Sequence, residues 1–181
     1  FGAQGGDWGA SVTAYLGFAY PHNLIGIHVT SMTRPTPYLG PGASALSAAE
    51  KTYLAQREAW LQAEGGYSHM QGTKPQTLSY GLNASPAGLA AWIVEKYRTW
   101  SDCHGDVESR FTKDELLTTI TLYWVTQTIN SSTRLYYETL RQPWTLQQNE
   151  RITVPSAMAA FPKEISRPPR EWGERSFNVR R

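Results

Sequence analysis

Cysteine, charge and long apolar runs are all scarce in this chain of 181 residues. Its one cysteine, Cys103, excludes an internal disulfide and a zinc site built from cysteines. The net charge of +2 is too small for the basic surface that nucleic acids or acidic membranes attract, so we expect neither partner. No apolar stretch approaches the roughly 18–20 residues that span a bilayer. These absences predict a soluble globular protein, most simply a cytoplasmic one.

The usual signals of a complete domain are also missing at both ends. The chain begins at Phe1 without a methionine and carries no signal peptide. It ends at Arg181, after a polar tail in which the sequence predicts no strand or helix. We therefore expect an internal fragment of a longer protein, and a membrane anchor before Phe1 stays open. Open sheet edges would make such a fragment prone to aggregate on its own.

The order of the predicted elements is that of an α/β protein. A Gly-rich turn leads into a helix over residues 10–20, which Pro21 ends. The β-branched residues 24–30 then predict a buried, parallel strand, and residues 152–161 predict another. A helix followed by a parallel strand is half of a βαβ unit.

A long helical region separates these strands. Its helix-starting signals are Ser47–Glu50, Ser85-Pro86 and Thr112–Glu115. We expect the last of its helices to break near Asn130–Ser132, and the Gly-rich residues 65–75 to be irregular. The sequence therefore predicts a core of residues 1–32 and 151–181, incomplete at both ends, with residues 33–150 inserted as a helical cap.

The strongest local signal is the pentapeptide Gly5-Gly6-Asp7-Trp8-Gly9. A nucleophile flanked by small residues, between a strand and a helix, is typical of the nucleophile elbow of α/β-hydrolases. The strained turn requires small residues two positions before and after the nucleophile. The backbone N–H of Trp8 would then serve as an oxyanion donor. The simpler alternative is that Asp7 only caps a helix in a Gly-rich turn.

Aspartate at the elbow changes the chemistry that the motif predicts. Serine suits acyl transfer, in which a base removes the hydroxyl proton. A carboxylate is already ionised at neutral pH and attacks an sp3 carbon that bears a leaving group. The resulting ester then needs a base-activated water. Asp7 therefore favours displacement at carbon over ester or amide hydrolysis.

Further blocks make the pattern specific. They are the elbow, Tyr67–Pro75, Leu82–Lys96, Ser131–Glu138 and Val154–Glu164. In this order, from end to end of the chain, they resemble the microsomal-type epoxide hydrolases. The resemblance implies an α/β-hydrolase core, a parallel sheet with flanking helices, with an α-helical cap inserted between two core strands.

The resemblance also implies roles for single residues. Asp7 falls on the nucleophile of the family, and Glu164 falls on the acid that orients the catalytic histidine. Tyr67 and Tyr136 fall on the paired cap tyrosines that polarise the epoxide oxygen, with Tyr137 as the alternative to Tyr136. A tyrosine hydroxyl suits this task because it donates a hydrogen bond without ionising at neutral pH. Without the family, each tyrosine would be a core aromatic and Glu164 a solvated loop carboxylate.

The sequence departs from the family at the general base. The base histidine should follow Glu164 after one more strand, and the histidines present, His22, His28, His69 and His104, do not fit that place. We interpret them as structural or exposed. The oxyanion-hole loop that precedes the elbow in the family is missing too, so we expect this stretch alone to be inactive.

The predicted function is hydrolysis of epoxides to vicinal diols through an ester of Asp7. Aromatic residues make up 12% of the chain, and Trp8 and Trp124 favour an apolar substrate pocket. The expected partners are a small epoxide and water, without a cofactor or a metal, and the oligomeric state, a dimer included, stays open. The alternatives are a haloalkane dehalogenase, which also has an Asp-Trp elbow, and a non-catalytic ligand-binding module of the hydrolase fold.

Overall fold

The computed structural model describes residues 1–31 and 34–181. Contacts divide these residues into two compact units, one of residues 1–60 and 144–181 and one of residues 61–143. The predicted boundary at residues 32 and 33 lies outside the described residues. We describe the α/β unit, which holds the sheet, and then the helical unit of residues 61–143.

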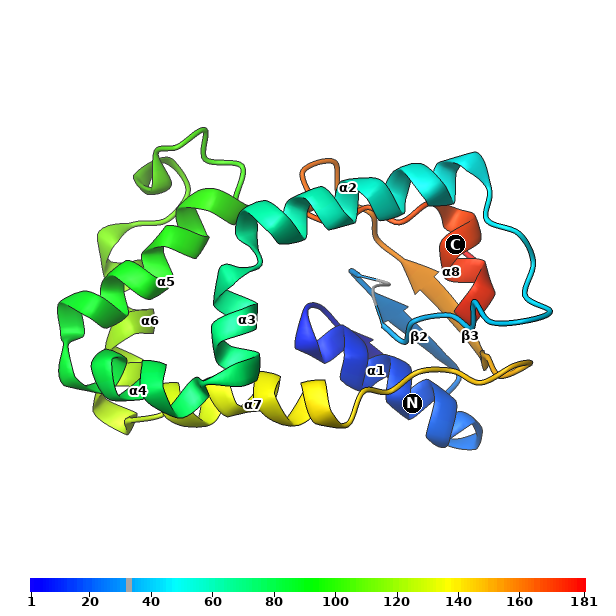
Figure 1. Cartoon of the computed structure of the whole chain (residues 1–181), viewed down its shortest axis with the longest axis horizontal. Helices are drawn as coiled ribbons and strands as arrows, with labels where there is room; N and C mark the ends of the chain where they lie inside the picture. Colours follow the sequence, from blue (N-terminus) through cyan, green and yellow to red (C-terminus); the bar gives the residue numbers. More distant parts are fainter. Residues whose placement is uncertain (32–33) are drawn as a thin grey trace. The chain divides into compact units, whose positions relative to one another are not determined.

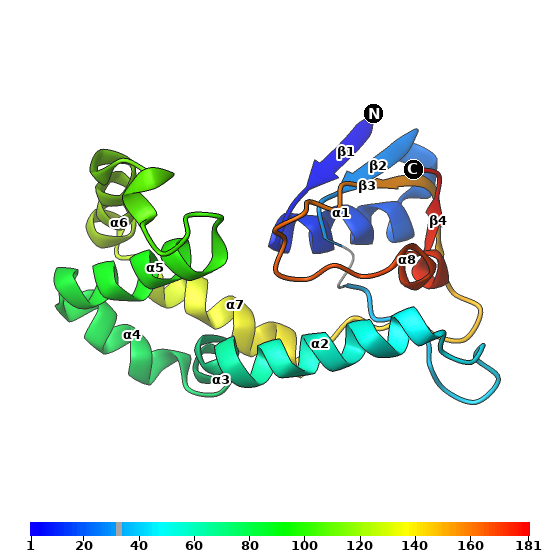
Figure 2. The same cartoon turned by 90° about the horizontal axis from the view of Figure 1, so that it is seen from above.

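The sheet of the α/β unit is parallel throughout its described strands, as predicted. The strands are β1 (Gly2–Gly5), β2 (Gly26–Val29), β3 (Ile152–Met158) and β4 (Phe177–Val179), in the spatial order β1-β2-β3-β4 (Figure 2). Val29 pairs with Gly5 on one side and with Met158 on the other. Since these strands end in register, the segments that follow them leave from the same edge of the sheet.

Helix α1 (Trp8–Ala19) packs against β1, β2 and β3 through small residues (Figure 2). Ala14 is fully buried, and a Cβ added at Gly17 would lie 3.1 Å from Ile152 and 3.2 Å from Ile27. This close approach explains why the buried positions of α1 carry small residues. A 3-10 turn, η1 (Pro21–Asn23), ends the helix at Pro21, as predicted.

The end of the chain differs from the prediction of a polar tail. It forms α8 (Arg170–Ser176) and β4, and Trp172 and Phe177 are buried there. The sequence signal fails because α8 is short and mostly polar. β4 adds only three residues to the sheet, too few to show an alternating pattern.

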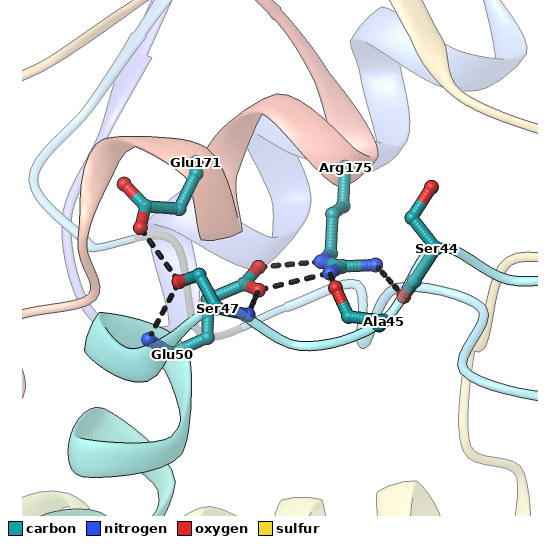
Figure 3. A network of polar contacts seen from close by, with 6 residues as sticks. All are labelled: Ser44, Ala45, Ser47, Glu50, Glu171 and Arg175. Atoms are coloured by element: carbon teal, nitrogen blue, oxygen red, sulfur yellow. Dashed lines mark hydrogen bonds and ion pairs between the residues drawn. The ribbon is translucent and has the colours of Figure 1, made fainter.

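Helix α2 (Ala48–Glu64) begins at the predicted capping box. The Ser47 N–H donates to Glu50 Oε2 at 2.8 Å, and the Glu50 N–H donates to Ser47 Oγ at 3.1 Å. Figure 3 shows that Glu50 is also held by Arg175 of α8 through a bidentate ion pair, with Nη2 at 2.8 Å from Oε2. Arg175 also donates to the carbonyls of Ser44 and Ala45. This buried pair ties α8 to the start of α2.

The helical unit contains α3 (Gly66–Thr73), α4 (Pro75–Ala84), α5 (Pro86–Trp100), the 3-10 turn η2 (Val107–Ser109), α6 (Lys113–Thr126) and α7 (Ile129–Arg141) (Figure 1). Its apolar core is made by Leu82, Leu89, Ile120 and Ile129. The predicted caps are present: Ser85 Oγ accepts from the Gly88 N–H at 3.0 Å, and Thr112 and Glu115 form a reciprocal capping box.

The prediction of irregular backbone over residues 65–75 is wrong. These residues form α3 and the start of α4, which are separated at Lys74. Gly72 is buried, and a Cβ there would lie 3.3 Å from Leu140 of α7. The glycine therefore serves close packing of α3 on α7 and does not mark a loop.

The predicted break in the last helical region lies earlier than expected. Gln127 has a left-handed backbone, φ 57°, and ends α6. Ser131 and Ser132 lie inside α7, where their hydroxyls donate to the carbonyls of Thr128 and Ile129. Serine hydroxyls bonded to the preceding turn are compatible with a helix. Within the described residues, no helix is both long and apolar enough to cross a membrane.

Candidate active site

Asp7 occupies the turn between the end of β1 and the start of α1. Its backbone has φ 46° and ψ −124°, outside the regions that a non-glycine residue ordinarily adopts. Such strain costs of order 1–3 kcal/mol and concentrates at functional sites. The side chain of Asp7 is exposed, beside the amino end of α1. The backbone N–H groups of the first turn there favour a negative charge.

The three glycines around Asp7 are not equally necessary for this turn. A Cβ at Gly5 would collide with the carbonyl of Gly9 and lie 2.7 Å from Thr13 Oγ1, so this position must be glycine. A Cβ at Gly6 would lie 2.6 Å from Thr30 Oγ1. At Gly9, by contrast, no described atom beyond its chain neighbours and the adjacent backbone of α1 lies within 4 Å of the added Cβ. The predicted need for a small residue is thus confirmed before Asp7, and the described contacts do not require one after it.

Trp8 is the first residue of α1, so its N–H belongs to the helix end that the sequence analysis singled out as an oxyanion donor. The indole ring is half-buried. The guanidinium carbon of Arg34 lies 5.1 Å from the centroid of a Trp8 ring, within cation–π range. Nothing in the sequence pattern pointed to Arg34.

Glu164 lies in the loop that follows β3 and is half-buried. The Glu164 N–H donates to the carbonyl of Phe161 at 3.2 Å, and Oε1 accepts the N–H of Ile165 at 2.9 Å. These bonds give the loop a defined turn. Asp7 and Glu164 thus follow the carboxyl ends of β1 and β3, which leave the same edge of the sheet with β2 between them.

In the helical unit, the structure brings Tyr67 of α3 and Tyr136 of α7 together. Their ring centroids are 5.8 Å apart, and the planes meet at 79°. Tyr137 is not part of this pair, because its ring is covered by Arg141, whose guanidinium carbon lies 3.2 Å from the ring centroid. The contact with Tyr67 therefore favours Tyr136 over Tyr137 as the second candidate, and the role itself stays a prediction.

The last aromatic candidate, Trp124, and the four histidines complete the set of residues considered from the sequence. Trp124 of α6 packs against the apolar core of the helical unit. His22, His69 and His104 are exposed, and His28 is half-buried on β2. Among the described residues, no group of three or more His, Cys, Asp or Glu is placed to hold a metal ion.

The chain is similar in sequence to known proteins over nearly its whole length. The chain is 40% identical over 179 residues to a putative epoxide hydrolase of Stigmatella aurantiaca, and the match covers 97% of this chain and 39% of that protein. It is 36% identical over 197 residues to epoxide hydrolase 1 of Sus scrofa, covering 98% of this chain and 43% of that protein. The chain is a homologue of the epoxide hydrolases. No family model matches it.

Solved structures agree with the sequence relatives. Aspergillus niger epoxide hydrolase superposes with a TM-score of 0.77 at 31% identity, covering 99% of this chain and 44% of that one. Juvenile hormone epoxide hydrolase from Bombyx mori gives a TM-score of 0.80 at 28% identity, covering 100% and 47%. The predicted α/β-hydrolase fold is confirmed. The chain spans about two fifths of the length of the curated relatives named above.

Sequence reasoning missed the side chains that surround the tyrosine pair. Trp100 lies edge-on to Tyr67, with ring centroids 4.9 Å apart, and Lys96 lies over both rings. Lys96 ends one of the blocks that carry the family resemblance, and its i,i+4 spacing from Trp100 was a signal that the two share a helix face.

Proposed function

We propose that this protein is an epoxide hydrolase that converts apolar epoxides and water to vicinal diols through a covalent ester of Asp7. The observation that carries the proposal is the aspartate in a strained turn at the carboxyl edge of a parallel sheet, beside a helix amino end. The α/β unit would supply the nucleophile and the acid, and the helical unit would be the cap, as the sequence analysis proposes for residues 33–150.

The first step would be displacement at an epoxide carbon. A carboxylate oxygen of Asp7 forms a bond to that carbon while the carbon–oxygen bond of the ring breaks, and its electron pair goes to the epoxide oxygen. An alkoxide is a poor leaving group unless it receives a hydrogen bond or a proton as it forms. Tyr67 and Tyr136 would supply that donation, and their edge-to-face contact supports a shared target.

The second step would release the diol. A base-activated water attacks the carbonyl carbon of the Asp7 ester, and the bond from that carbon to the bridging ester oxygen breaks. That oxygen, which Asp7 supplied in the first step, leaves on the diol and takes up a proton, and the water oxygen stays on Asp7. The Trp8 N–H would stabilise the oxyanion that forms. Glu164 would orient the base histidine that the family resemblance implies. We assign none of His22, His28, His69 or His104 to that role.

The substrate would be an aryl or bulky alkyl epoxide, which is the class that the aromatic candidates Trp8 and Trp124 favour. Water is the second substrate, and no step needs a cofactor. Relatives named juvenile hormone epoxide hydrolases, from Ctenocephalides felis and Bombyx mori, match at 32% and 37% identity, which supports epoxide hydrolysis as the reaction.

The test is diol formation by the intact protein and its Asp7→Asn variant, with styrene oxide as the probe. We expect the variant to lose essentially all activity, because an amide is a far weaker nucleophile. Asp114→Asn is the matched control, since Asp114 lies exposed in the first turn of α6. Wild-type diol formation by the Asp7 variant would contradict the proposal. Halide release from a chloroalkane with epoxides left intact would favour the dehalogenase, and recovery of unchanged epoxide would favour a binding module.

A further inference from the structure

A lysine from another helix lies against the ring of Tyr67. Nζ of Lys96, on α5, is 5.1 Å from the centroid of the Tyr67 ring and 5.0 Å from that of Trp100. The two rings meet edge to face, with centroids 4.9 Å apart at 63°. Both rings are therefore packed around one ammonium group. The cation–π range extends to about 6 Å, so each ring attracts the same charge.

Carboxylates fix this ammonium group in place. Nζ of Lys96 lies 2.6 Å from Glu95 Oε2 and 3.9 Å from Glu64 Oε2. The Trp100 indole N–H donates to that same Glu64 oxygen at 3.2 Å. The Lys96 side chain is only 21% exposed, so its contacts are partly shielded from water and gain strength. The hydrogen bond from Lys96 lowers the pKa of Glu95, which keeps that partner ionised.

The Tyr67 ring thus contacts Lys96 and Trp100, and it also contacts the ring of Tyr136. We propose that Lys96 is a positioning residue for Tyr67: with Glu64 and Trp100 it fixes the phenol ring so that its hydroxyl and that of Tyr136 reach the same epoxide oxygen. This inference rests on the proposed function. Hydrogen bonds weaken steeply with misalignment, and a displacement of about 1 Å can cost about 10²-fold in rate.

A purely structural lysine would act differently. Its aliphatic chain would cover the two rings, and methionine, which is similar in length and also packs well on aromatic rings, would replace it at little cost. Lys96→Met therefore removes the charge and keeps most of the packing. Lys113→Met is the matched control, because Lys113 is 74% exposed and pairs only with Glu108 among the ion pairs described, at 3.5 Å.

The first test is a double-mutant cycle on the single-turnover rate of Asp7 ester formation, measured on the intact protein with styrene oxide. We expect Lys96→Met to slow this step about tenfold with KM little changed, a size typical of a shielded cation–π contact. In a Tyr67→Phe background, the same change should cost less than about twofold, because Lys96 acts through that hydroxyl. Lys96→Arg should recover most of the rate, and Lys113→Met should match the wild type. Equal losses in both backgrounds would overturn the inference.

The second test does not depend on turnover. With 13C-labelled tyrosine, the ring signals of Tyr67 are assigned by their loss in Tyr67→Phe. We expect them to shift or broaden in Lys96→Met and to stay unchanged in Lys113→Met; unchanged Tyr67 signals in Lys96→Met would overturn the inference. If the wild type forms no diol, the proposed function fails, and this spectrum still decides whether Lys96 positions the ring. Glu64→Gln, which loosens the same cluster, is the second variant should Lys96→Met fail to fold.

Discussion

Replacing Arg175 with methionine removes the partner of the most deeply buried charge in the α/β unit. Glu50 is 2% exposed, and Arg175 holds both of its carboxylate oxygens (Figure 3). In Arg175→Met the carboxylate stays buried without a counter-charge, which typically costs about 3–5 kcal/mol. We expect a loss of this size in the free energy of unfolding of the intact protein, measured by urea titration near neutral pH.

The same pair predicts a pH dependence with a definite sign. The hydrogen bond from Arg175, the largest influence, lowers the pKa of Glu50 below its ordinary value of 4.5. The unfolded chain therefore binds the Glu50 proton first as the pH falls, and the stabilisation, complete above 4.5, is lost as the pH falls through the folded-state pKa. In Arg175→Met, protonation instead relieves the unpaired charge. The stability gap between wild type and variant should therefore narrow under acid conditions.

Two further variants separate the charge from other effects. Arg170→Met, on the same helix, removes an exposed pair with Glu174, whose side chains are 56% and 47% exposed. It should change the free energy of unfolding by no more than about 0.5 kcal/mol. Adding Glu50→Gln to Arg175→Met should restore part of the lost stability, because no charge is left buried. The reasoning is refuted if Arg175→Met is as stable as Arg170→Met, or if its deficit does not change with pH.

The remaining predictions concern the elbow and the tyrosine pair. Gly5→Ala should destabilise the protein by about 1–3 kcal/mol or more in urea titration, because its Cβ meets fixed backbone, whereas Gly9→Ala should be tolerated; equal losses would contradict this account of the turn. Tyr67→Phe and Tyr136→Phe should each slow ester formation by about 10²–10³-fold in single-turnover kinetics. Tyr137→Phe should stay within about twofold of the wild type, and a loss equal to that of Tyr136→Phe would reverse the choice between them.

Local rules predicted the parts of the fold that local residues determine. The capping residues Ser47, Ser85 and Thr112 begin helices where expected, because a cap satisfies backbone donors within a few residues. The prediction that Gly72 belongs to a loop failed because this glycine allows close packing against Leu140, which is distant in sequence. Likewise, β4 is a strand only because β3 is beside it.

In the candidate site, too, the local features could be predicted and the contacts between distant residues could not. The elbow could be identified from sequence because its motif falls within five consecutive residues, Gly5 to Gly9. Which of Tyr136 and Tyr137 contacts Tyr67 could not be predicted, because adjacent helix positions differ only in which neighbours they face. The position of Lys96 over Tyr67 depends on α3 and α5 folding together, and no spacing within either helix encodes it.

The central claim is that Asp7 forms an ester with the substrate, and a single turnover in 18O-labelled water tests it most directly. With the intact protein in excess over styrene oxide, water attacks the ester carbonyl, so the diol takes its new oxygen from Asp7. We predict an unlabelled first diol and one 18O atom in the peptide that contains Asp7, with no label there in Asp7→Asn. A labelled first diol and an unlabelled Asp7 peptide would mean that water attacks the epoxide directly, and the account would be wrong.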